Sequence, residues 1–422
     1  MFALVDCNSF FCSVEKVFHP GLKNKPVVVL SSNDGCIVAL TPEAKAVGLH
    51  RGDPIFKVKD IVTHNNVHVF STNMMLYAAM SKRIVSIMRE NVSQVEQYSI
   101  DESFCDLHGY EKHFDLVGMM RELKDKILLY TDIPVSVGIA PTKTLAKMGS
   151  KFAKQYKGYR GVCMIDTDEK RRKALSLFPL NDVWDIGRQT LAKLEYFGIR
   201  TPLEFADKSE SWVRSHFTKP GIQTWLELNG HPCIDTDEIH QKQTICTSRS
   251  FGEMVSGFDS LKASIATFAS SCANKLRGQA SGAKSVTVFI ASNRFREDLP
   301  QYGNSATVSL LVPTSDTLEI TKAAISALQS IWREGIQYKR SGVIVSDIQP
   351  NEHIEGNLFD PIKNRPERAR LMQTIDNINH QYGLKTIQMA VEGDDKQTWK
   401  VKCEHRSGNY LTNADELLTV RG

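Results

Sequence analysis

The chain reads Tyr-Ser-Ile-Asp-Glu-Ser-Phe-Cys-Asp over residues 98–106, and this stretch decides the predicted fold. Its apolar character indicates a buried strand, but the strand carries two adjacent acids, Asp101 and Glu102. Because burial of an unpaired carboxylate is costly, two neighbouring carboxylates need a counter-charge, and a divalent cation supplies one. A second apolar run, Phe-Ala-Leu-Val-Asp over residues 2–6, also ends in an acid, Asp6. Two acid-bearing strands far apart in sequence therefore predict one metal site that forms on folding.

The alternative interpretation of these acids is structural. Asp6 could end its strand, and Asp101 and Glu102 could pair with nearby lysines. That interpretation is the better one for a single acid, but for the set we favour a metal, because few pairing partners are close in sequence. Sites made of carboxylate oxygens suit Mg²⁺ or Mn²⁺. Since neighbouring strand residues point to opposite faces, Asp101 and Glu102 share a site only at a strand end, bend or bulge, which we assume.

Composition sets the broad class. A chain of 422 residues predicts two to four domains of roughly 100–200 residues each. Hydrophobic residues make up 41% and charged residues 24%, which is typical of a soluble globular protein. The net charge of +4 gives no sign of a nucleic-acid partner, so any basic surface must be local. Nine cysteines without a Cys-x-x-Cys pair favour a reducing compartment. Without a basic leader or an apolar run of about 18–20 residues, we expect no signal peptide, no membrane contact and a cytoplasmic protein.

Hydrophobic periodicity predicts an α+β protein with two separate cores. The first core has a βαββαβ-like order, in which the end of the first strand lies beside the acidic strands. We expect its strands at 2–6, 95–107 and 135–139, and its helices at 77–90, at 114–130 and from 142 onward; a further strand is expected at 27–30. After a polar linker at 231–243, residues 244–347 show a second strand–helix–strand–strand–helix–strand order. Residues 351–422 are polar and irregular, with a short helix near 366–379.

Two further features lie near the acids. Phe10 and Phe11 follow the first strand directly and either pack in the core or form a wall under a nucleotide sugar; the sequence leaves both open. Lysines at 143, 147, 151 and 154 share one face of a helix. Such a run is usually a solvated face, but beside the proposed site one or two lysines could bind a triphosphate.

Residues that could bind DNA occur in two regions. Asp-Ile-Gly-Arg at 185–188 resembles the turn of a helix–hairpin–helix, in which Gly187 exposes backbone N–H groups to a phosphate. A structural corner between two helices has a similar pattern. Arg249, Arg294 and Arg296 are among the basic residues of 244–347 that could line a groove for the DNA backbone. Taken singly, each is more often a solvated surface residue.

Several segments of the sequence together resemble a known protein family. Met1–Asp6, Ser9–Phe11, Tyr98–Glu102, Val137–Lys147 and the 182–199 hairpin occur in the order seen in Y-family translesion DNA polymerases. The chain resembles that family over about residues 1–350. Together with the other segments, the Ser-Ile-Asp-Glu motif is highly specific. Within the family, a closer likeness to the UmuC group is carried by four short segments, at residues 33–36, 248–253, 302–306 and 399–402.

The resemblance implies a division of the chain into parts. These would be a ferredoxin-like palm, fingers, a helical thumb with the helix–hairpin–helix, a linker, a separate α/β little-finger domain that binds DNA, and a C-terminal tail with clamp- and partner-binding segments. Their expected ranges are 1–11 and 73–162, 12–72, 163–230, 231–243, 244–350 and 351–422. The implied activity is error-prone, template-directed nucleotidyl transfer from a dNTP to a primer 3′-OH in the SOS response to DNA damage.

The resemblance also implies catalytic roles. The acids Asp6, Asp101 and Glu102 would hold two Mg²⁺ ions, with the Cys7 backbone carbonyl as a further ligand. Phe11 falls at the steric-gate position, where an aromatic ring blocks a ribose 2′-OH.

Other implied contacts involve nucleotide phosphates and proteins. Lys45 and Lys154 fall where family members contact the triphosphate. Leu358 and Phe359 would supply the apolar part of a sliding-clamp peptide, in which Glu355 replaces the usual Gln. A cleaved UmuD-type dimer and a RecA filament are the remaining partners that the resemblance implies, beside primer-template DNA.

Two other functions remain as alternatives. A non-catalytic DNA-binding or recruitment module would need only the hairpin and the basic domain, and the intact acids argue against it. A metal-dependent nucleotidyl cyclase with a similar palm is disfavoured by the hairpin and by the second domain of DNA-binding size.

Overall fold

The computed structural model describes residues 1–235, 241–383, 385–393 and 399–419. These residues form two compact units: the first comprises Met1–Ser31, Gly35–Ile239 and His405–Gly422, and the second comprises Ser32–Asp34 and His240–Glu404. Part of the expected linker at 231–243, residues 236–240, lies outside the described residues. No helix in the described ranges has both the length and the apolar character needed to cross a membrane.

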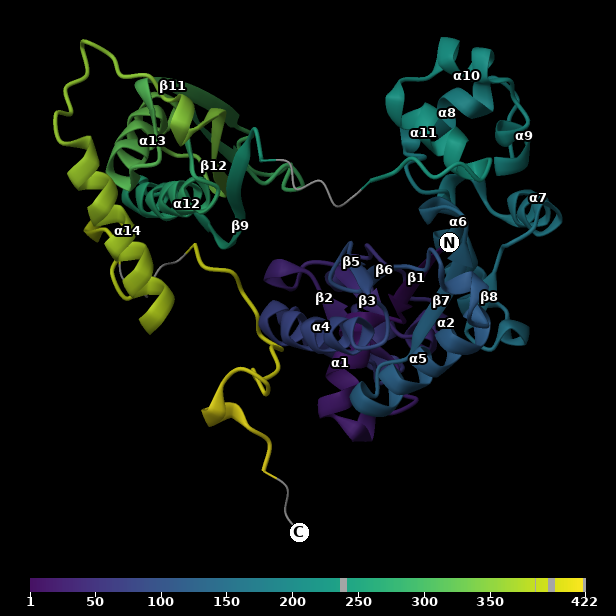
Figure 1. Cartoon of the computed structure of the whole chain (residues 1–422). Helices are drawn as coiled ribbons and strands as arrows, with labels where there is room; N and C mark the ends of the chain where they lie inside the picture. The colour runs from purple at the N-terminus through teal and green to yellow at the C-terminus, as the bar shows by residue number, and fades with distance from the viewer. Residues whose placement is uncertain (236–240, 384, 394–398, 420–422) are drawn as a thin grey trace. The chain divides into compact units, whose positions relative to one another are not determined.

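A five-stranded sheet is the centre of the first unit, in the order β5-β6-β1-β7-β8 (Figure 1). Strand β1 lies in the middle and runs antiparallel to both β6 and β7, whereas β7 and β8 are parallel. The strand bounds are β1 Phe2–Cys7, β5 Gln94–Gln97, β6 Glu102–Asp106, β7 Val135–Ala140 and β8 Val162–Met164. This is the expected βαββαβ-like core, and it places the first strand beside the acidic hairpin.

Helices cover both faces of this sheet. One face packs on α1 (Phe10–Phe18), α4 (Met74–Arg89) and α5 (Leu116–Thr131). The other face packs on α6 (Lys143–Gln155). Because side chains alternate along a strand, Ala3 and Val5 point to the first face and Leu4 to the α6 face. The next even position is Asp6, which therefore lies on the α6 side.

The acidic stretch differs from its expected form. Residues 98–101 form the turn of a hairpin and not a strand, and β6 begins only at Glu102. The Ser99 hydroxyl accepts hydrogen bonds from the N–H groups of Asp101 and Glu102, at 3.2 and 3.0 Å. Such local side-chain bonds compete with strand pairing and close a turn. Asp101 thus lies at a strand end, as the shared site requires.

A small sheet and a helical group complete the first unit. The sheet has the order β3-β2-β4, with β2 Val27–Leu30, β3 Ile37–Leu40 and β4 His68–Ser71. Two short helices, α2 Pro42–Ala46 and α3 Lys59–His64, lie between β3 and β4 in the chain. Thr41 caps α2 with Pro42 at the first helical position. The helical group is α7 Asp168–Leu177, α8 Arg188–Tyr196, α9 Pro202–Ala206, α10 Glu210–His216 and α11 Lys219–Leu228.

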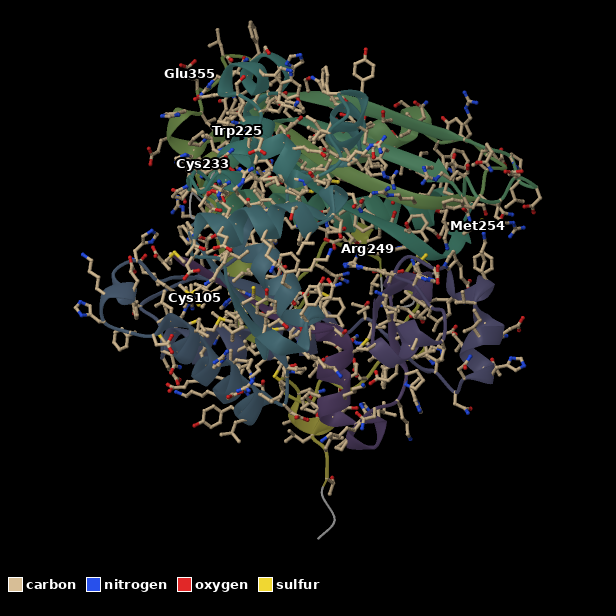
Figure 2. All side chains as sticks on the ribbon, turned by 90° about the vertical axis from the view of Figure 1, so that its right-hand side faces the viewer. Cys105, Trp225, Cys233, Arg249, Met254 and Glu355 are labelled. Carbon is tan, nitrogen blue, oxygen red and sulfur yellow. The ribbon has the colours of Figure 1, made fainter. Side chains whose placement is uncertain are left out.

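The helical group is held together by caps and ring contacts. Thr201 and Glu204 form the full capping box that the sequence indicates. Trp225, labelled in Figure 2, donates its ring N–H to the Ala206 carbonyl at 3.2 Å. The predicted helix–hairpin–helix differs from the structure in its first helix. A single 3-10 turn, Leu180–Asp182, stands before Gly187 in place of that helix.

The second unit has the predicted order of strands and helices. Its sheet has the order β11-β10-β12-β9, with two helices packed on one face (Figure 1). The elements are β9 Ile245–Val255, α12 Phe258–Gly278, β10 Ser281–Ser292, β11 Gly303–Thr314, α13 Thr317–Ile331 and β12 Tyr338–Pro350. The core between sheet and helices contains the expected apolar stripe of α12, including Leu261, Ile265 and Phe268.

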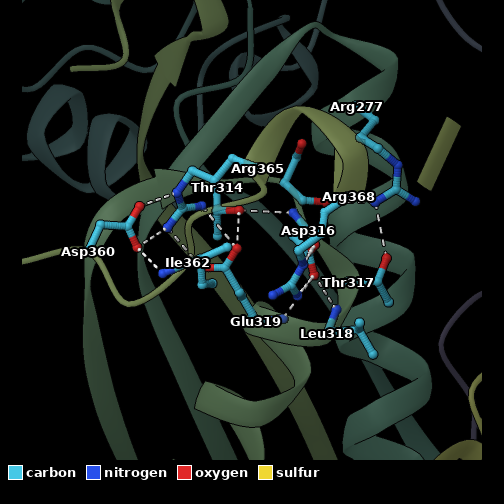
Figure 3. Close-up of polar contacts among 11 residues, drawn as sticks. Arg277, Thr314, Asp316, Thr317, Leu318, Glu319, Asp360, Ile362, Arg365 and Arg368 are labelled. Carbon is cyan, nitrogen blue, oxygen red and sulfur yellow. Dashed lines mark hydrogen bonds and ion pairs between the residues drawn. The ribbon is translucent and has the colours of Figure 1, made fainter. Parts of the chain in front are cut away.

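The C-terminal residues are divided between the two units. Helix α14 (Arg365–Tyr382) is longer than the short helix expected there and is held to the second unit by ion pairs. Arg365 pairs with Glu319 at 3.0 Å, and Arg368 pairs with Asp316 at 2.7 Å (Figure 3). Residues 405–419 pack instead on the first unit. The tail expected as one segment at 351–422 therefore has two separate docking sites.

The contact between β7 and α6 gives a stability prediction. A Cβ at Gly138 would lie 2.0 Å from the Ala146 carbonyl oxygen and 2.1 Å from the Ser150 nitrogen. Both atoms are backbone, so Gly138→Ala must push α6 away from the sheet. We expect it to destabilise the first unit by about 3 kcal/mol or more, measured as a fall in the thermal unfolding midpoint. Gly158→Ala is the control, because a Cβ at Gly158 meets nothing within 4 Å. Equal midpoints for the two variants would contradict this packing.

Candidate active site

Strand register brings the three acids together at one end of the sheet. In the antiparallel pair β1–β6, Asp6 lies directly opposite Glu102. Residues opposite each other in such a pair project from the same face. The Cys7 N–H donates to the Asp101 carbonyl at 2.9 Å, which ties the hairpin turn to the end of β1. The site is therefore built from the last residues of one strand and the first residues of another.

The turn that carries Asp101 is stabilised by its own side chains. The Ser99 hydroxyl donates to the Asp101 carboxylate at 2.7 Å while it accepts from two backbone N–H groups. A single hydroxyl thus fixes both the backbone and the carboxylate of the turn. Sequence analysis did not identify Ser99 as a site residue, although a Ser two positions before an Asp is typical of such turns.

Helix α6 supplies positive charge to this face. Lys147 lies 2.8 Å from Glu102, and Lys154 lies 3.5 Å from Asp6. The two lysines are seven residues apart, so they project from the same face of the helix. Pairing with lysines, the structural alternative raised for the acids, is thus observed for Glu102 and Asp6. Lys147 was not among the expected site residues, although its spacing from Lys154 was a usable signal.

The other two lysines of the run also pair with acids. Lys143 is buried and lies 2.6 Å from Glu96, and Lys151 pairs with Asp182. The lysine run is therefore not simply a solvated face of the helix.

The surroundings of Asp6 disfavour the charged form of its carboxyl group. Burial raises the pKa of Asp6 to about 6; the nearby Lys154 lowers it, and the charges of Glu102 and Asp101 raise it further. Mutual repulsion of this kind is relieved by a cation. The donor set is all oxygen, which fits a hard divalent ion. Within the described part of the chain, no three acidic, histidine or cysteine side chains already converge as metal ligands. Ion binding therefore requires the carboxylates to turn from their lysine partners.

Two neighbouring aromatic residues differ in exposure. Helix α1 begins after Ser9, whose left-handed backbone (φ 46°, ψ 46°) turns the chain sharply away from β1. Phe10 is 2% exposed and packs in the core, so core packing accounts for it and its ring has no surface to offer a nucleotide. Phe11 is only partly buried and stacks on Tyr77, with ring centroids 4.5 Å apart and planes at 16°. Tyr77 gave no signal in the sequence beyond its place in the helical stripe.

The remaining expected site residues belong to other elements than the acids. Lys45 is exposed on α2, and none of the contacts described for the chain joins it to the acid cluster. Gly187 is exposed and forms the N-cap of α8. Arg249 is exposed on β9 of the second unit (Figure 2). In the loop between β10 and β11, Arg294 lies over the Phe295 ring, and Arg296 pairs with Asp298 at 2.6 Å.

The expected clamp-binding residues are accessible. Leu358 and Phe359 are 93% and 80% exposed, in the segment between β12 and α14. Both side chains are therefore accessible to a partner.

Comparisons with known proteins identify the family of the chain. The impB/mucB/samB family model matches residues 5–151, and the model of that family's C-terminal domain matches residues 242–358. A domain of unknown function matches residues 369–420. Protein UmuC of Salmonella typhimurium is 40% identical over the full length of both chains. DNA polymerase IV 2 of Bacillus subtilis is 26% identical over 91% of this chain and 92% of its own.

Solved structures show the same fold. A Y-family DNA polymerase chimera of Dbh and Dpo4 has a TM-score of 0.64 at 23% identity, over 83% of this chain and all of its own. An insertion ternary complex of Dbh DNA polymerase has a TM-score of 0.54 at 23% identity, with the same coverage. The resemblance inferred from the sequence motifs is confirmed. The chain belongs to the impB/mucB/samB family and has the fold of a Y-family DNA polymerase.

Proposed function

We propose that this chain is a DNA-directed DNA polymerase that copies damaged templates. The observation that carries the proposal is the strand register, which places the backbone positions of Asp6, Asp101 and Glu102 next to one another at one end of β1 and β6. The relatives support it, because a 26% identical protein is named a DNA polymerase and a solved structural neighbour is named an insertion ternary complex. The division into palm, fingers, thumb, little finger and tail belongs to the same proposal, with the ranges expected from the sequence.

In the proposed reaction, the primer 3′-OH attacks the α-phosphate of a dNTP, the bond to the β-phosphate oxygen breaks, and pyrophosphate leaves. Asp6, Asp101 and Glu102, with the Cys7 backbone carbonyl, would hold two Mg²⁺ ions. When bound, the ions would stabilise the charge on the attacking and leaving oxygens. To hold the ions, Glu102 and Asp6 would exchange their contacts with Lys147 and Lys154. Lys154 then becomes available to bind the triphosphate.

The sugar and the outer phosphates are bound by other residues of the first unit. Phe11 has a partly exposed ring that is stacked on Tyr77, which suits a gate against a ribose 2′-OH. Lys45 is an exposed cation on α2 and contacts the triphosphate once the nucleotide is bound.

DNA and protein partners bind outside the acid cluster. Backbone N–H groups at Gly187 bind a DNA phosphate, and Arg249, Arg294 and Arg296 contact the DNA backbone from the second unit. Arg296 must first leave Asp298. We propose the sliding clamp as the partner of Leu358 and Phe359. The SOS response, the cytoplasm, a cleaved UmuD-type dimer and a RecA filament are part of the same proposal, and they rest on the family.

Removal of one carboxylate tests the central proposal. Asp101→Ala or Glu102→Ala should reduce Mg²⁺-dependent primer extension by more than the ~10–100-fold loss typical of changes around a metal site. The reason is that each variant loses a proposed metal ligand. Single-nucleotide incorporation on a primed template measures the effect.

The matched control for this experiment is Asp106→Ala, an acid on the same strand β6 that pairs with His108. Normal extension by Asp101→Ala would disprove the metal assignment. Binding of DNA by the purified chain without any incorporation would favour the recruitment module, and nucleotide turnover without template would favour the cyclase.

The role of Phe11 has a separate test. Phe11→Ala should admit ribonucleotides, because the ring that would meet the 2′-OH is gone. We expect the ratio of kcat/KM for dNTP over rNTP to fall by at least about tenfold, equivalent to about 1.4 kcal/mol. Phe56→Ala, at an aromatic residue that is 74% exposed, is the control. Unchanged sugar discrimination in Phe11→Ala would remove its role as a gate.

Clamp binding is tested in the full chain. A double variant, Leu358→Ala with Phe359→Ala, should weaken binding to a bacterial sliding clamp by about tenfold or more, because two exposed apolar anchors are lost. Surface plasmon resonance measures the Kd. Leu371→Ala, an exposed leucine on α14, is the control. If the double variant binds as the wild type does, these residues are not the anchors.

A further inference from the structure

Residues 405–411, called the C-terminal strap below, pack on the first unit beside β4, α4 and α1. His405 and Ser71, the last residue of β4, are joined by two hydrogen bonds: the Ser71 N–H donates to the His405 carbonyl, and the His405 N–H donates to the Ser71 hydroxyl, both at 2.9 Å. Further along, Tyr410 packs against Phe18 of α1, with ring centroids 5.0 Å apart. Both ends of the strap are thus fixed to the unit that carries the acid cluster.

The middle of the strap is held by the start of α4. The N-cap residue of α4, Asn73, is fully buried. Its side-chain amide donates to the carbonyls of Ser407 and Gly408, at 2.9 and 3.2 Å. Its side-chain oxygen accepts from the Leu76 N–H at 3.3 Å. One buried side chain therefore both caps the helix and fixes the position of Ser407.

Ser407 completes the environment of a buried carboxylate. Glu15 of α1 is fully buried. Its Oε1 atom accepts hydrogen bonds from the Ser407 hydroxyl at 2.9 Å and from the Tyr77 hydroxyl at 2.7 Å. Its Oε2 atom accepts none from the residues that the structure describes. Since a buried carboxylate is costly without hydrogen bonds, the two hydroxyl donors carry most of its stabilisation.

Tyr77 connects this carboxylate to the proposed sugar gate. The Tyr77 hydroxyl is anchored on Glu15, and the Tyr77 ring stacks on Phe11. The contacts therefore run without a gap from Ser407 through Glu15 and Tyr77 to Phe11. A ring held at one end by a hydrogen bond and on one face by a stack has little freedom to shift.

We propose that Ser407 is a positioning residue for sugar selection, because it holds the Glu15–Tyr77 pair that supports the Phe11 ring. The inference rests on the proposed polymerase function and extends it to the C-terminal residues. It also gives a role to part of the segment 369–420, for which the matching family model is a domain of unknown function. The strap thus takes part in nucleotide selection although its sequence is more than 390 residues from Phe11.

The test removes one hydroxyl from the strap of the full chain. Ser407→Ala should lower the ratio of kcat/KM for dNTP over rNTP by about three- to tenfold, the size of the effect of one ordinary hydrogen bond. Thr412→Ala, an exposed Thr just past the strap, is the matched control and should leave the ratio unchanged. Tyr77→Phe keeps the ring but loses the hydroxyl, and it should lower the ratio by a similar factor.

A double variant, Ser407→Ala with Tyr77→Phe, distinguishes a positioning role of Ser407 from a general loosening of the first unit. If Ser407 acts through Tyr77, the double variant should lose no more discrimination than the more affected single variant. An unchanged ratio in Ser407→Ala, or single effects that multiply in the double variant, would overturn the proposal.

A second measurement does not depend on polymerase activity. Amide hydrogen exchange in peptides covering residues 10–18 and 74–80 should be faster in Ser407→Ala than in Thr412→Ala, because α1 and α4 share the Glu15 contacts. Equal exchange in the two variants would overturn the strap's connection to these helices. If the wild type incorporates no nucleotide at all, the polymerase function fails while the exchange result still decides whether the strap positions the Phe11 stack.

Discussion

The antiparallel register of β1 against β6 is the constraint on which the site depends. It places Asp6 opposite Glu102, and the hydrogen bond from the Cys7 N–H to the Asp101 carbonyl adds the third acid. A slip of one residue would turn Asp6 to the opposite face of the sheet, into the core formed with α4 and α5. The apolar residues Leu4 and Phe104 fix the register, because both pack against α6. Core packing and site assembly are therefore the same event in this fold.

Helix α6 balances the charge that this register concentrates. Lys147 pairs with Glu102 and Lys154 pairs with Asp6, and both carboxylates remain partly exposed. Removing such partners is costly in a partly buried site, whereas exchanging them for a cation keeps the charge balanced. A second buried carboxylate, Glu15, is stabilised in another way, by hydroxyl groups from α4 and from the C-terminal strap. The first unit thus contains one acid cluster that can exchange partners and one acid that is fixed.

Local patterns in the sequence identified most of the elements. The helices expected at 77–90 and 114–130 are present as α4 (Met74–Arg89) and α5 (Leu116–Thr131), and the second unit has the expected order of strands and helices. The sequence pattern predicted a strand over residues 98–101, which form a turn. An apolar pattern gives no sign of the hydrogen bonds that the Ser99 hydroxyl makes in this turn.

Local patterns could not predict contacts between residues that are far apart in the sequence. The bond between Ser407 and Glu15 spans 392 residues, and neither residue belongs to a periodic pattern that would reveal it. The pairing of Lys147 with Glu102 follows from how α6 packs on the sheet, which Gly138 permits by its lack of a Cβ. The acids were found because a carboxylate in an apolar strand is conspicuous, whereas a lysine on a helix is not.

The most direct test of the account is a crystal structure of the full chain with primer-template DNA, a dNTP and Mn²⁺, using the anomalous signal to locate the ions. The account expects two anomalous peaks among Asp6, Asp101 and Glu102, with Glu102 turned from Lys147 and Asp6 turned from Lys154. Peaks elsewhere, with both ion pairs still intact beside the bound nucleotide, would contradict it.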